Sequence, residues 1–268
     1  MASLNQDINF LFENYDIGER RLFGEGTPKQ IWLSSPTIEK LERMSIDDEF
    51  PHGHRVLILA PHPDDEIVGC AGLIQQLIAK GIEIVLIAIT NGTSSHPNST
   101  LYQPYQLNQL RPLESLNALK FLGAQNIERI EFNILDGEVS HHFKTIVQKL
   151  EKVIRPNDIL VSTFYLDGHP DHEFTAYAAY QIATQYQLKF YQVLIWALHW
   201  ADPESSKIPW EYGLRLDLNK SQIELKEQAI RCFKTQIESD NTTNQPPILL
   251  EHAIQRVLIP FEIYIHEK

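Results

Sequence analysis

The sequence predicts an α/β fold, in which a mostly parallel sheet carries helices on both of its faces. Strand and helix patterns alternate from residue 55 onward, several of the strand stretches are continuously apolar, and 268 residues are enough to build one large core. A strand that is apolar along its whole length is typical of a parallel sheet that is buried on both faces. One large domain therefore explains the pattern better than two small ones.

The first half of this pattern starts at the apolar run RVLILA. Residues 55–60 are expected to form the first core strand. Residues 66–81 are expected to form a helix, because apolar residues recur at helical spacing and Gly81 suits the end of a helix. The pattern then predicts a strand at 83–90, a long polar loop at 91–107, a helix at 109–123 and a strand at 127–135.

The second half continues the alternation. It predicts helices at 141–154, 173–186 and 221–237, strands at 158–165 and 190–198, and a loop at 238–248. The last strand, 257–265, is expected at an edge of the sheet, because Pro260 lacks the N–H group that a central strand donates. Residues 1–54 show no clear period, and they are expected to form an N-terminal arm that packs on a main domain of residues 55–268.

Charge and composition exclude several classes of partner. The formal net charge of −12 argues against nucleic acid and against anionic membrane surfaces, because both attract clustered Lys and Arg. No apolar run approaches the length of a membrane span, and the first residues do not resemble a signal peptide. The two cysteines suggest free thiols in a reducing compartment, so a cytoplasmic protein is expected. A homo-oligomer is left open.

A dense polar cluster, PHPDDE, follows the first core strand. It contains His62, Asp64, Asp65 and Glu66. Acids in the first turn of a helix complement the helix dipole, so a purely structural explanation exists for the carboxylates, and for Glu66 it is at least as good as a role in the site. That explanation does not account for His62, because the same dipole disfavours a cation there.

A second cluster, DGHPDHEF, has the same local design at residues 167–174. It follows the strand predicted at 158–165 and opens the next helix, so both clusters are expected at the carboxyl edge of the sheet. His169 and His172 are three residues apart, a spacing that can aim two side chains at one point. Two histidines and a carboxylate are the ligands of a catalytic zinc with an open position, and such a cation would neutralise the acids.

The two clusters together resemble the LmbE/PIG-L family of zinc-dependent N-deacetylases. Members of that family remove acetyl groups from N-acetylglucosamine units on inositol, phosphatidylinositol, malate or other sugar conjugates. The resemblance extends to TNG at 90–92, RPLESLNALKFLGA at 111–124, LDG at 135–137 and KEQAIRCFKTQ at 226–236, where Thr235 replaces a serine. It covers about residues 55–237 and implies a Rossmann-like, LmbE-like sheet.

The resemblance implies a role for each residue of the two clusters. His62, Asp65 and His172 become the metal ligands, and Asp64 becomes the general base for attack by a metal-bound water. His169, in its protonated form, becomes the group that stabilises the oxyanion. Zinc (Zn²⁺) is the implied cofactor, although the same ligands accept Fe²⁺ and Mn²⁺.

The remaining predicted site residues lie further along the chain. The resemblance implies an orienting role for Asp171 and a sugar contact for Arg111, which by itself would be explained as a surface arginine. Asp136 lies at a strand end that faces the site, so it is expected to contact the substrate, and Asn91 is a further candidate. Both are also explained as turn residues. The loop at 91–107 is unusually long, so it is expected to border the pocket and to help select the substrate. His199, Trp196 and Trp200 are more readily explained as packed residues than as site residues.

The function predicted from these residues is that of a metal-dependent hydrolase. Its partner would be a small-molecule N-acetyl sugar conjugate, from which it removes the acetyl group. The alternative is a non-catalytic carbohydrate-binding protein that contains a metal. Asp64 favours the enzyme, because a purely structural metal site has no need of a second carboxylate. A nucleotide-binding protein is disfavoured, because no Gly-rich turn follows the first strand.

Overall fold

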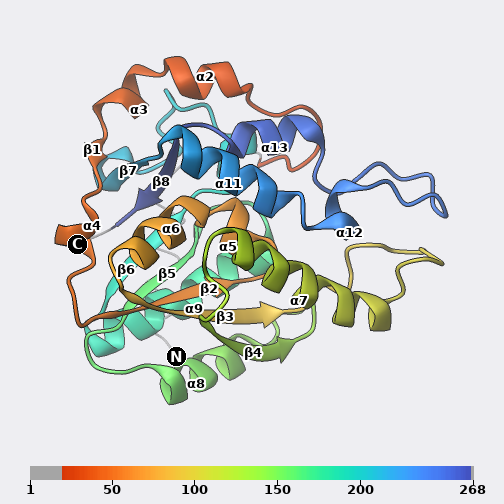
Figure 1. The fold of residues 1–268 in the computed structure, drawn as a ribbon, viewed down its shortest axis with the longest axis horizontal. Helices are drawn as coiled ribbons and strands as arrows, with labels where there is room; N and C mark the ends of the chain where they lie inside the picture. Colours follow the sequence, from red (N-terminus) through yellow and green to blue (C-terminus); the bar gives the residue numbers. More distant parts are fainter. Residues whose placement is uncertain (1–19, 267–268) are drawn as a thin grey trace.

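One sheet runs through the centre of the molecule (Figure 1). The computed structural model describes residues 20–266, and within them eight strands follow the order β1-β7-β8-β6-β5-β2-β3-β4. Their bounds are β1 Glu42–Arg43, β2 Arg55–Ala60, β3 Glu83–Thr90, β4 Glu128–Ile134, β5 Ile159–Thr163, β6 Lys189–Val193, β7 Gly213–Asp217 and β8 Phe261–Ile265.

The sheet is mostly parallel, as the sequence predicts. Strand β2 pairs in parallel with β3 and β5, and the pairs β3–β4, β5–β6 and β1–β7 are parallel too. Only β8 runs the other way, antiparallel to both β6 and β7. The carboxyl ends of β2, β3, β4, β5 and β6 therefore meet at one edge, where α/β sheets bind their ligands.

Helices cover both faces of this sheet, and the residues of β2 show why. Val56 and Ile58 pack into the core on one face, whereas Leu57 and Leu59 pack into the core on the other. Helices α6 (Ala71–Ala79), α7 (Pro104–Phe121) and α11 (Lys220–Ile230) cover the first face, and α8 (Phe143–Val153) and α9 (Pro170–Tyr186) cover the second (Figure 1). A strand buried on both sides needs the continuous apolar run that RVLILA provides.

The described part of the N-terminal arm joins the sheet through β1. Trp32 in the arm is fully buried, and its Nε1 donates a hydrogen bond to the Leu198 carbonyl at 3.0 Å. A boundary at residue 54 stays a prediction, and residues 1–19 of the predicted arm lie outside the described residues. The remaining helices are short: α2 Lys29–Ser34, α3 Pro36–Lys40, α4 Ile46–Glu49, α5 Asp65–Val68, α10 Ala197–Trp200, η1 Trp210–Tyr212, α12 Lys234–Ile237 and α13 Glu251–Val257. Within residues 20–266, none of the helices has both the length and the apolar character that a bilayer crossing requires.

Two predicted helices are each interrupted. The helix predicted at 66–81 is two helices, α5 and α6, with a break where the chain passes close to β6; a Cβ on Gly69 would lie 2.8 Å from Val193 Cγ1. The helix predicted at 221–237 likewise divides into α11 and α12. The predicted loop at 91–107 is shorter, because α7 begins at Pro104 after a capping box formed by Gln103 and Gln106.

The prediction that the last strand lies at an edge is wrong. Strand β8 lies between β6 and β7, and the edges of the sheet are β1 and β4. Pro260 lies just before the strand, where its carbonyl accepts a hydrogen bond from Leu218 N at 2.9 Å. The ladder therefore needs no N–H group from the proline. Strand β7 and helix α13 were not among the predicted elements.

Candidate active site and metal centre

Polar side chains from both sequence clusters line one cavity at the carboxyl edge of the sheet. The cavity has a volume of about 290 Å³. His62, Asp64 and Asp65 reach it from the turn after β2, and His169 and His172 reach it from the start of α9. Asp136 follows β4, and Trp196 follows β6. The structure thus brings together residues from His62 to Leu249 that lie far apart in the sequence.

Three potential ligand atoms converge in this cavity. Asp65 Oδ2 lies 3.3 Å from His62 Nδ1 and 3.3 Å from His172 Nε2. The ligand atoms of these three buried residues all lie within 4.8 Å of one another. His172 Nε2 is buried and makes no hydrogen bond. A buried imidazole nitrogen that faces a carboxylate and a second imidazole without a hydrogen bond fits a divalent cation well.

The charges around these atoms also suit a cation. Burial alone would lower the pKa of His172, but the carboxylates of Asp65 and Asp167 raise it to about 9. Burial alone would also lower the pKa of His62, but the neighbouring carboxylates raise it well above its usual value. Burial would raise the pKa of Asp65, but His172 and His62 hold it well below its usual value. The carboxylates of the site thus favour a positive charge on each of the two histidines, His62 and His172. One divalent cation bound to the neutral histidines would supply the same total charge.

Asp167 holds His172 in its orientation. Its Oδ2 lies 2.8 Å from His172 Nδ1, and the carboxylate accepts backbone N–H groups from Ile195, Trp196 and Ala197 at 2.8–3.3 Å. These N–H groups turn the chain out of β6 and into α10, which is why the predicted strand 190–198 ends at Val193. Asp167 was not among the predicted site residues, although it is the first residue of DGHPDH.

The other nitrogen of His62 faces two further carboxylates. Its Nε2 lies 3.2 Å from Asp136 Oδ1 and 3.2 Å from Asp171 Oδ2. Burial would raise the pKa of Asp136, but the hydrogen bond with His62 lowers it to about 2. His62, His169 and Asp171 form a second group of potential ligands, but His62 and Asp171 are already hydrogen-bonded to each other there. The set His62, Asp65 and His172 is therefore the better cation site.

Asp64 lies in the same cavity, but its carboxylate is not one of the three converging ligand groups. Its Oδ2 lies 3.2 Å from Arg111 Nη2, and its backbone N donates to Glu66 Oε2 at 3.1 Å. Burial raises the pKa of Asp64 to about 7, even though Arg111 acts to lower it. Asp64 has a φ of 147°, a strained backbone for a residue other than glycine. Glu66 is itself buried and accepts a hydrogen bond from Ser115, so it supports the turn that presents Asp64.

His169, predicted to act as a protonated imidazole, lies at the cavity among other titratable groups. Burial and the neighbouring His172 and His62 lower the pKa of His169 to about 3, so its ring is neutral near pH 7. Its Nδ1 accepts a hydrogen bond from the backbone N of Asp171 at 3.2 Å. The single ring proton is therefore on Nε2.

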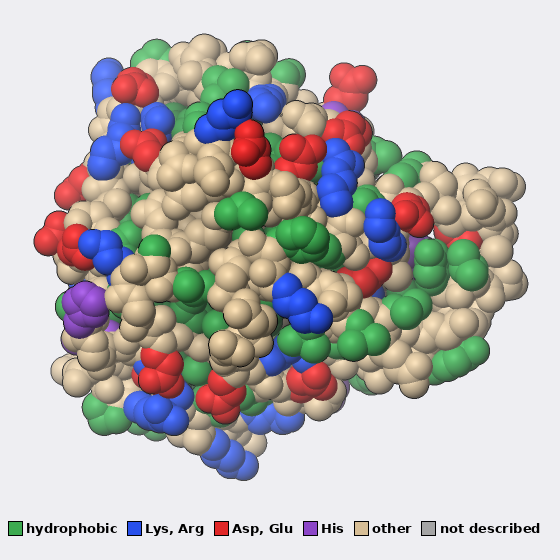
Figure 2. All heavy atoms as spheres, in the orientation of Figure 1, with side chains coloured by type: hydrophobic (Ala, Val, Ile, Leu, Met, Phe, Trp, Pro, Cys, Tyr) green, Lys and Arg blue, Asp and Glu red, His purple; other side chains and the backbone are tan. Residues whose placement is uncertain are grey.

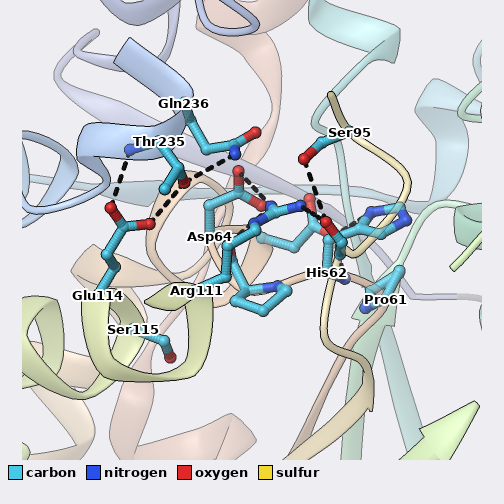
Figure 3. Close-up of polar contacts among 12 residues, drawn as sticks. Pro61, His62, Asp64, Ser95, Arg111, Glu114, Ser115, Thr235 and Gln236 are labelled. Carbon is cyan, nitrogen blue, oxygen red and sulfur yellow. Dashed lines mark hydrogen bonds and ion pairs between the residues drawn. The ribbon is translucent and has the colours of Figure 1, made fainter. Parts of the chain in front are cut away.

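The three predicted substrate contacts have different surroundings. Arg111 is buried at the cavity wall beside Asp64 (Figure 3). Its guanidinium donates to the carbonyls of Gly92 and Pro63 at 2.8 and 2.9 Å. Gly92 is required there, because a Cβ would lie 1.8 Å from Arg111 Nη1. Asp136 lines the cavity. Asn91 does not line it, and its side chain donates to Asn108 Oδ1 at 3.1 Å.

A further polar group reaches the cavity from α12. Glu114 on α7 accepts hydrogen bonds from Thr235 N at 2.8 Å and from Thr235 Oγ1 at 2.6 Å. Gln236 Nε2 donates to Thr235 Oγ1 at 2.9 Å, and the almost fully buried Gln236 lines the cavity beside Asp64 (Figure 3). No prediction included Gln236 or Glu114, although both lie in stretches that resemble the family. His199 contacts Arg256 and does not line this cavity.

The chain is similar to known deacetylases. Residues 57–183 match the sequence model of the family described as PIG-L, GlcNAc-PI de-N-acetylase. Diacetylchitobiose deacetylase of Thermococcus kodakarensis is 28% identical over 149 residues, which are 53% of this chain and 54% of that protein. A probable N-acetyl-alpha-D-glucosaminyl L-malate deacetylase 2 of Bacillus subtilis is 27% identical over 192 residues, 68% of this chain and 83% of that protein.

A solved structure shares the fold. N,N'-diacetylchitobiose deacetylase from Pyrococcus horikoshii superposes with a TM-score of 0.53 and 22% identity, over 74% of this chain and 76% of that chain. At this level of identity the likeness concerns the fold alone. The match to the Thermococcus protein spans only about half of that relative's length.

Proposed function

We propose that the chain is a metal-dependent N-deacetylase of the PIG-L (LmbE-like) family, whose sequence model matches its residues 57–183. Its substrate would be an N-acetylated amino sugar or sugar conjugate. The products would be acetate and the free amine. Zinc is the proposed metal, with Fe²⁺ and Mn²⁺ as alternatives, because His and carboxylate ligands accept all three.

One observation carries this proposal: a buried cation site lies next to a carboxylate that is not one of its ligands. His62, Asp65 and His172 would hold the cation. When bound, such a cation polarises a carbonyl and lowers the pKa of a nearby water. Asp64 stands beside this site in the same cavity, which a purely structural metal site does not require.

Asp64 is the proposed general base. A carboxylate in this position can take a proton from the attacking water and return it to the departing amine. The Arg111 contact at 3.2 Å favours the ionised form of Asp64 that proton abstraction needs. Glu66 holds the backbone N–H of Asp64 and Arg111 holds its side chain, so Asp64 has a fixed position in the cavity, as a base that must be oriented toward a bound substrate requires.

His169 is proposed to stabilise the negative charge that develops on the acetyl oxygen. Its Nε2–H is the available donor, because Nδ1 accepts the N–H of Asp171. A neutral imidazole can serve as such a donor. Gln236 and Asp136 offer polar groups to the sugar, and Trp196 offers an apolar face at the cavity wall.

Metal analysis combined with an amine-release assay tests this function. The purified protein should contain about one divalent ion per chain and should release free amine from at least one substrate in a panel of N-acetyl sugars. Chelation should abolish the release, and addition of the metal should restore it. Sugar binding with a full complement of metal but no amine release would favour the non-catalytic alternative.

A further inference from the structure

A second hollow adjoins the proposed active site. It is a groove of about 490 Å³ between residues 95–98 and residues 240–248, and it shares Ser95 and Ile248 with the cavity. The two loops project from the body side by side, at the right of Figure 1. Thr100 N donates to Thr242 Oγ1 at 3.1 Å, which joins the two loops, and Asp240 accepts the backbone N–H of Thr242 at 2.8 Å within the second loop.

The volumes indicate a substrate larger than one sugar. Pockets that bury small ligands span about 300–1,000 Å³, and the cavity alone lies at the bottom of that range. The groove more than doubles the available space. Because the two share wall residues, a ligand with its acetyl group at the metal centre can extend into the groove.

The charges of the two loops disfavour an anionic ligand. No Lys or Arg occurs in residues 93–110 or 235–255. Of the groove residues, Asp240 carries a charge: hydrogen bonds from the hydroxyls of Ser99 and Thr242 lower its pKa to about 2, so it is negative. Figure 2 agrees, since no Lys or Arg is visible at the far right end of the molecule, where the two loops lie. Carboxylate and phosphate groups are recognised mainly by cationic side chains. The residues that line this groove include no Lys or Arg, and burial together with Arg111 lowers the pKa of the histidine among them, His96.

The uncharged side chains of the groove suit a hydroxylated ring. Asn98 and Gln245 carry amides that both donate and accept hydrogen bonds, and Thr243 adds a hydroxyl. Pro97 and Pro246 provide flat apolar surfaces between them. An apolar wall with a few polar groups is the usual composition of a small-molecule site.

We propose that this groove binds a second, neutral sugar unit, so that the preferred substrate is a neutral oligosaccharide or glycoside and not an anionic conjugate. The proposal rests on the proposed deacetylase function, whose substrate class it narrows. Arg111 is a cation in the adjoining cavity, but it does not favour an anionic ligand, because its guanidinium is already bonded to Asp64, Gly92 and Pro63.

The first test compares three substrates. The ratio kcat/KM is measured with N-acetylglucosamine, with N,N'-diacetylchitobiose and with N-acetylglucosaminyl malate. The neutral disaccharide should exceed the monosaccharide by about tenfold or more, which corresponds to about 1.4 kcal/mol of added binding. The malate conjugate should do no better than the monosaccharide. Equal values for the two neutral sugars, or a preference for the malate conjugate, would overturn the proposal.

The second test changes the groove. The double variant Asn98→Ala/Gln245→Ala should bring the ratio of disaccharide to monosaccharide efficiency close to one, through a higher KM for the disaccharide. Gln245→Lys should raise the efficiency with the malate conjugate. Gln255→Ala is the matched control, because Gln255 lies on α13 and bonds Glu251 outside the groove. If the double variant still prefers the disaccharide, the second sugar binds outside this groove and the proposal is wrong.

The two proposals fail in different ways. If none of the three sugars is deacetylated, the proposed function fails. Calorimetric titration with N,N'-diacetylchitobiose then tests the groove alone. Binding that the double variant weakens supports the groove, and a lack of binding to the unaltered protein overturns it.

Discussion

His172 shows how much one buried histidine depends on its surroundings. Asp167 bonds its Nδ1, and three backbone N–H groups hold Asp167 in turn, so Nε2 faces Asp65 without a hydrogen bond of its own. A carboxylate behind a ligand histidine fixes the ring and strengthens it as a ligand. The protein fold therefore orders the three side chains that we propose as ligands.

Replacement of His172 by alanine should remove the metal. The expected result is a protein with near-normal circular dichroism and greatly reduced metal content, because the apolar strands do not need the cation to pack. Metal content is measured by mass spectrometry after dialysis. His141→Ala is the matched control, since His141 is exposed and remote from the three ligands. Full metal occupancy in His172→Ala would refute the ligand assignment.

Replacement of Asp64 by asparagine separates the base from the ligands. The variant should keep its metal, because Asp64 is outside the ligand set, and it should lose roughly two to four orders of magnitude in kcat. An asparagine oxygen can still accept from Arg111, so the local structure should persist. Asp47→Asn, which alters only an exposed ion pair with Lys80, is the control. Near-normal turnover with metal bound would remove Asp64 from the mechanism.

The sequence predicted some of these residues for a physical reason. His62, Asp64 and Asp65 lie within one turn after a strand, and HPDH repeats that design after another, so local spacing was enough to propose the site. Asp167 could not be identified in this way, because its partners at 195–197 are about thirty residues further along. The low pKa of His169 depends on burial and on the neighbouring His172 and His62. His62 follows a different strand, β2, so its approach to His169 could not be predicted from local spacing.

At the level of elements, α7 and α12 meet at the cavity through Glu114 and Thr235. Both the backbone N and the hydroxyl of Thr235 donate to the same carboxylate, and the hydroxyl also accepts from Gln236. The start of α12 is thus fixed against α7, and Gln236 is held in the cavity wall (Figure 3). Thr235 and Glu114 are positioning residues, and Gln236 is the group that they position.

Variants at this contact should change substrate binding more than chemistry. Gln236→Ala should raise KM by about tenfold with a smaller change in kcat, as expected when a neutral hydrogen bond to the substrate is lost. Thr235→Val should have a similar effect, whereas Thr235→Ser should retain most of the efficiency because it keeps the hydroxyl. The measurement is the separate change in KM and kcat. If Thr235→Ser were as impaired as Thr235→Val, the loss of substrate binding could not be attributed to the hydroxyl group.

Periodicity identified the elements that are buried on both sides, and it was less successful elsewhere. The run at 55–60 was predicted to the residue, because five successive apolar residues after Arg55 are typical of a short strand that is buried on both faces. Strand β7 was missed, since GLRLD is short and includes two charged residues. The breaks between α5 and α6 and between α11 and α12 follow from contacts with other elements, which helical spacing does not reveal.

For the whole molecule, a buried ion pair joins α11, α6 and β8. Lys226 Nζ lies 2.9 Å from Glu262 Oε1, and the same carboxylate accepts the backbone N–H groups of Gly72 and Leu73 at the start of α6. Both charged side chains are almost fully buried. Loss of one partner would leave the other charge unpaired in the core, which is costly.

Lys226→Ala should lower the free energy of unfolding by about 3 to 5 kcal/mol. The measurement is urea denaturation followed by fluorescence. Lys220→Ala on the same helix is the matched control: its exposed pair with Glu224, at 3.7 Å, should contribute less than about 0.5 kcal/mol. Equal effects of the two substitutions would mean that the buried pair adds nothing to the stability of the fold.

The oligomeric state of the protein, which the sequence leaves open, stays a prediction.

The place of β8 in the sheet also has a consequence for synthesis of the protein. Strands β1 and β7 contact the rest of the sheet only through β8, whose residues 261–265 leave the ribosome after every other strand. The half that carries both histidine motifs can pair its strands earlier, since β2 to β6 are adjacent without β8. The N-terminal strand β1 must therefore wait, unpaired with the core, until more than two hundred further residues have been made.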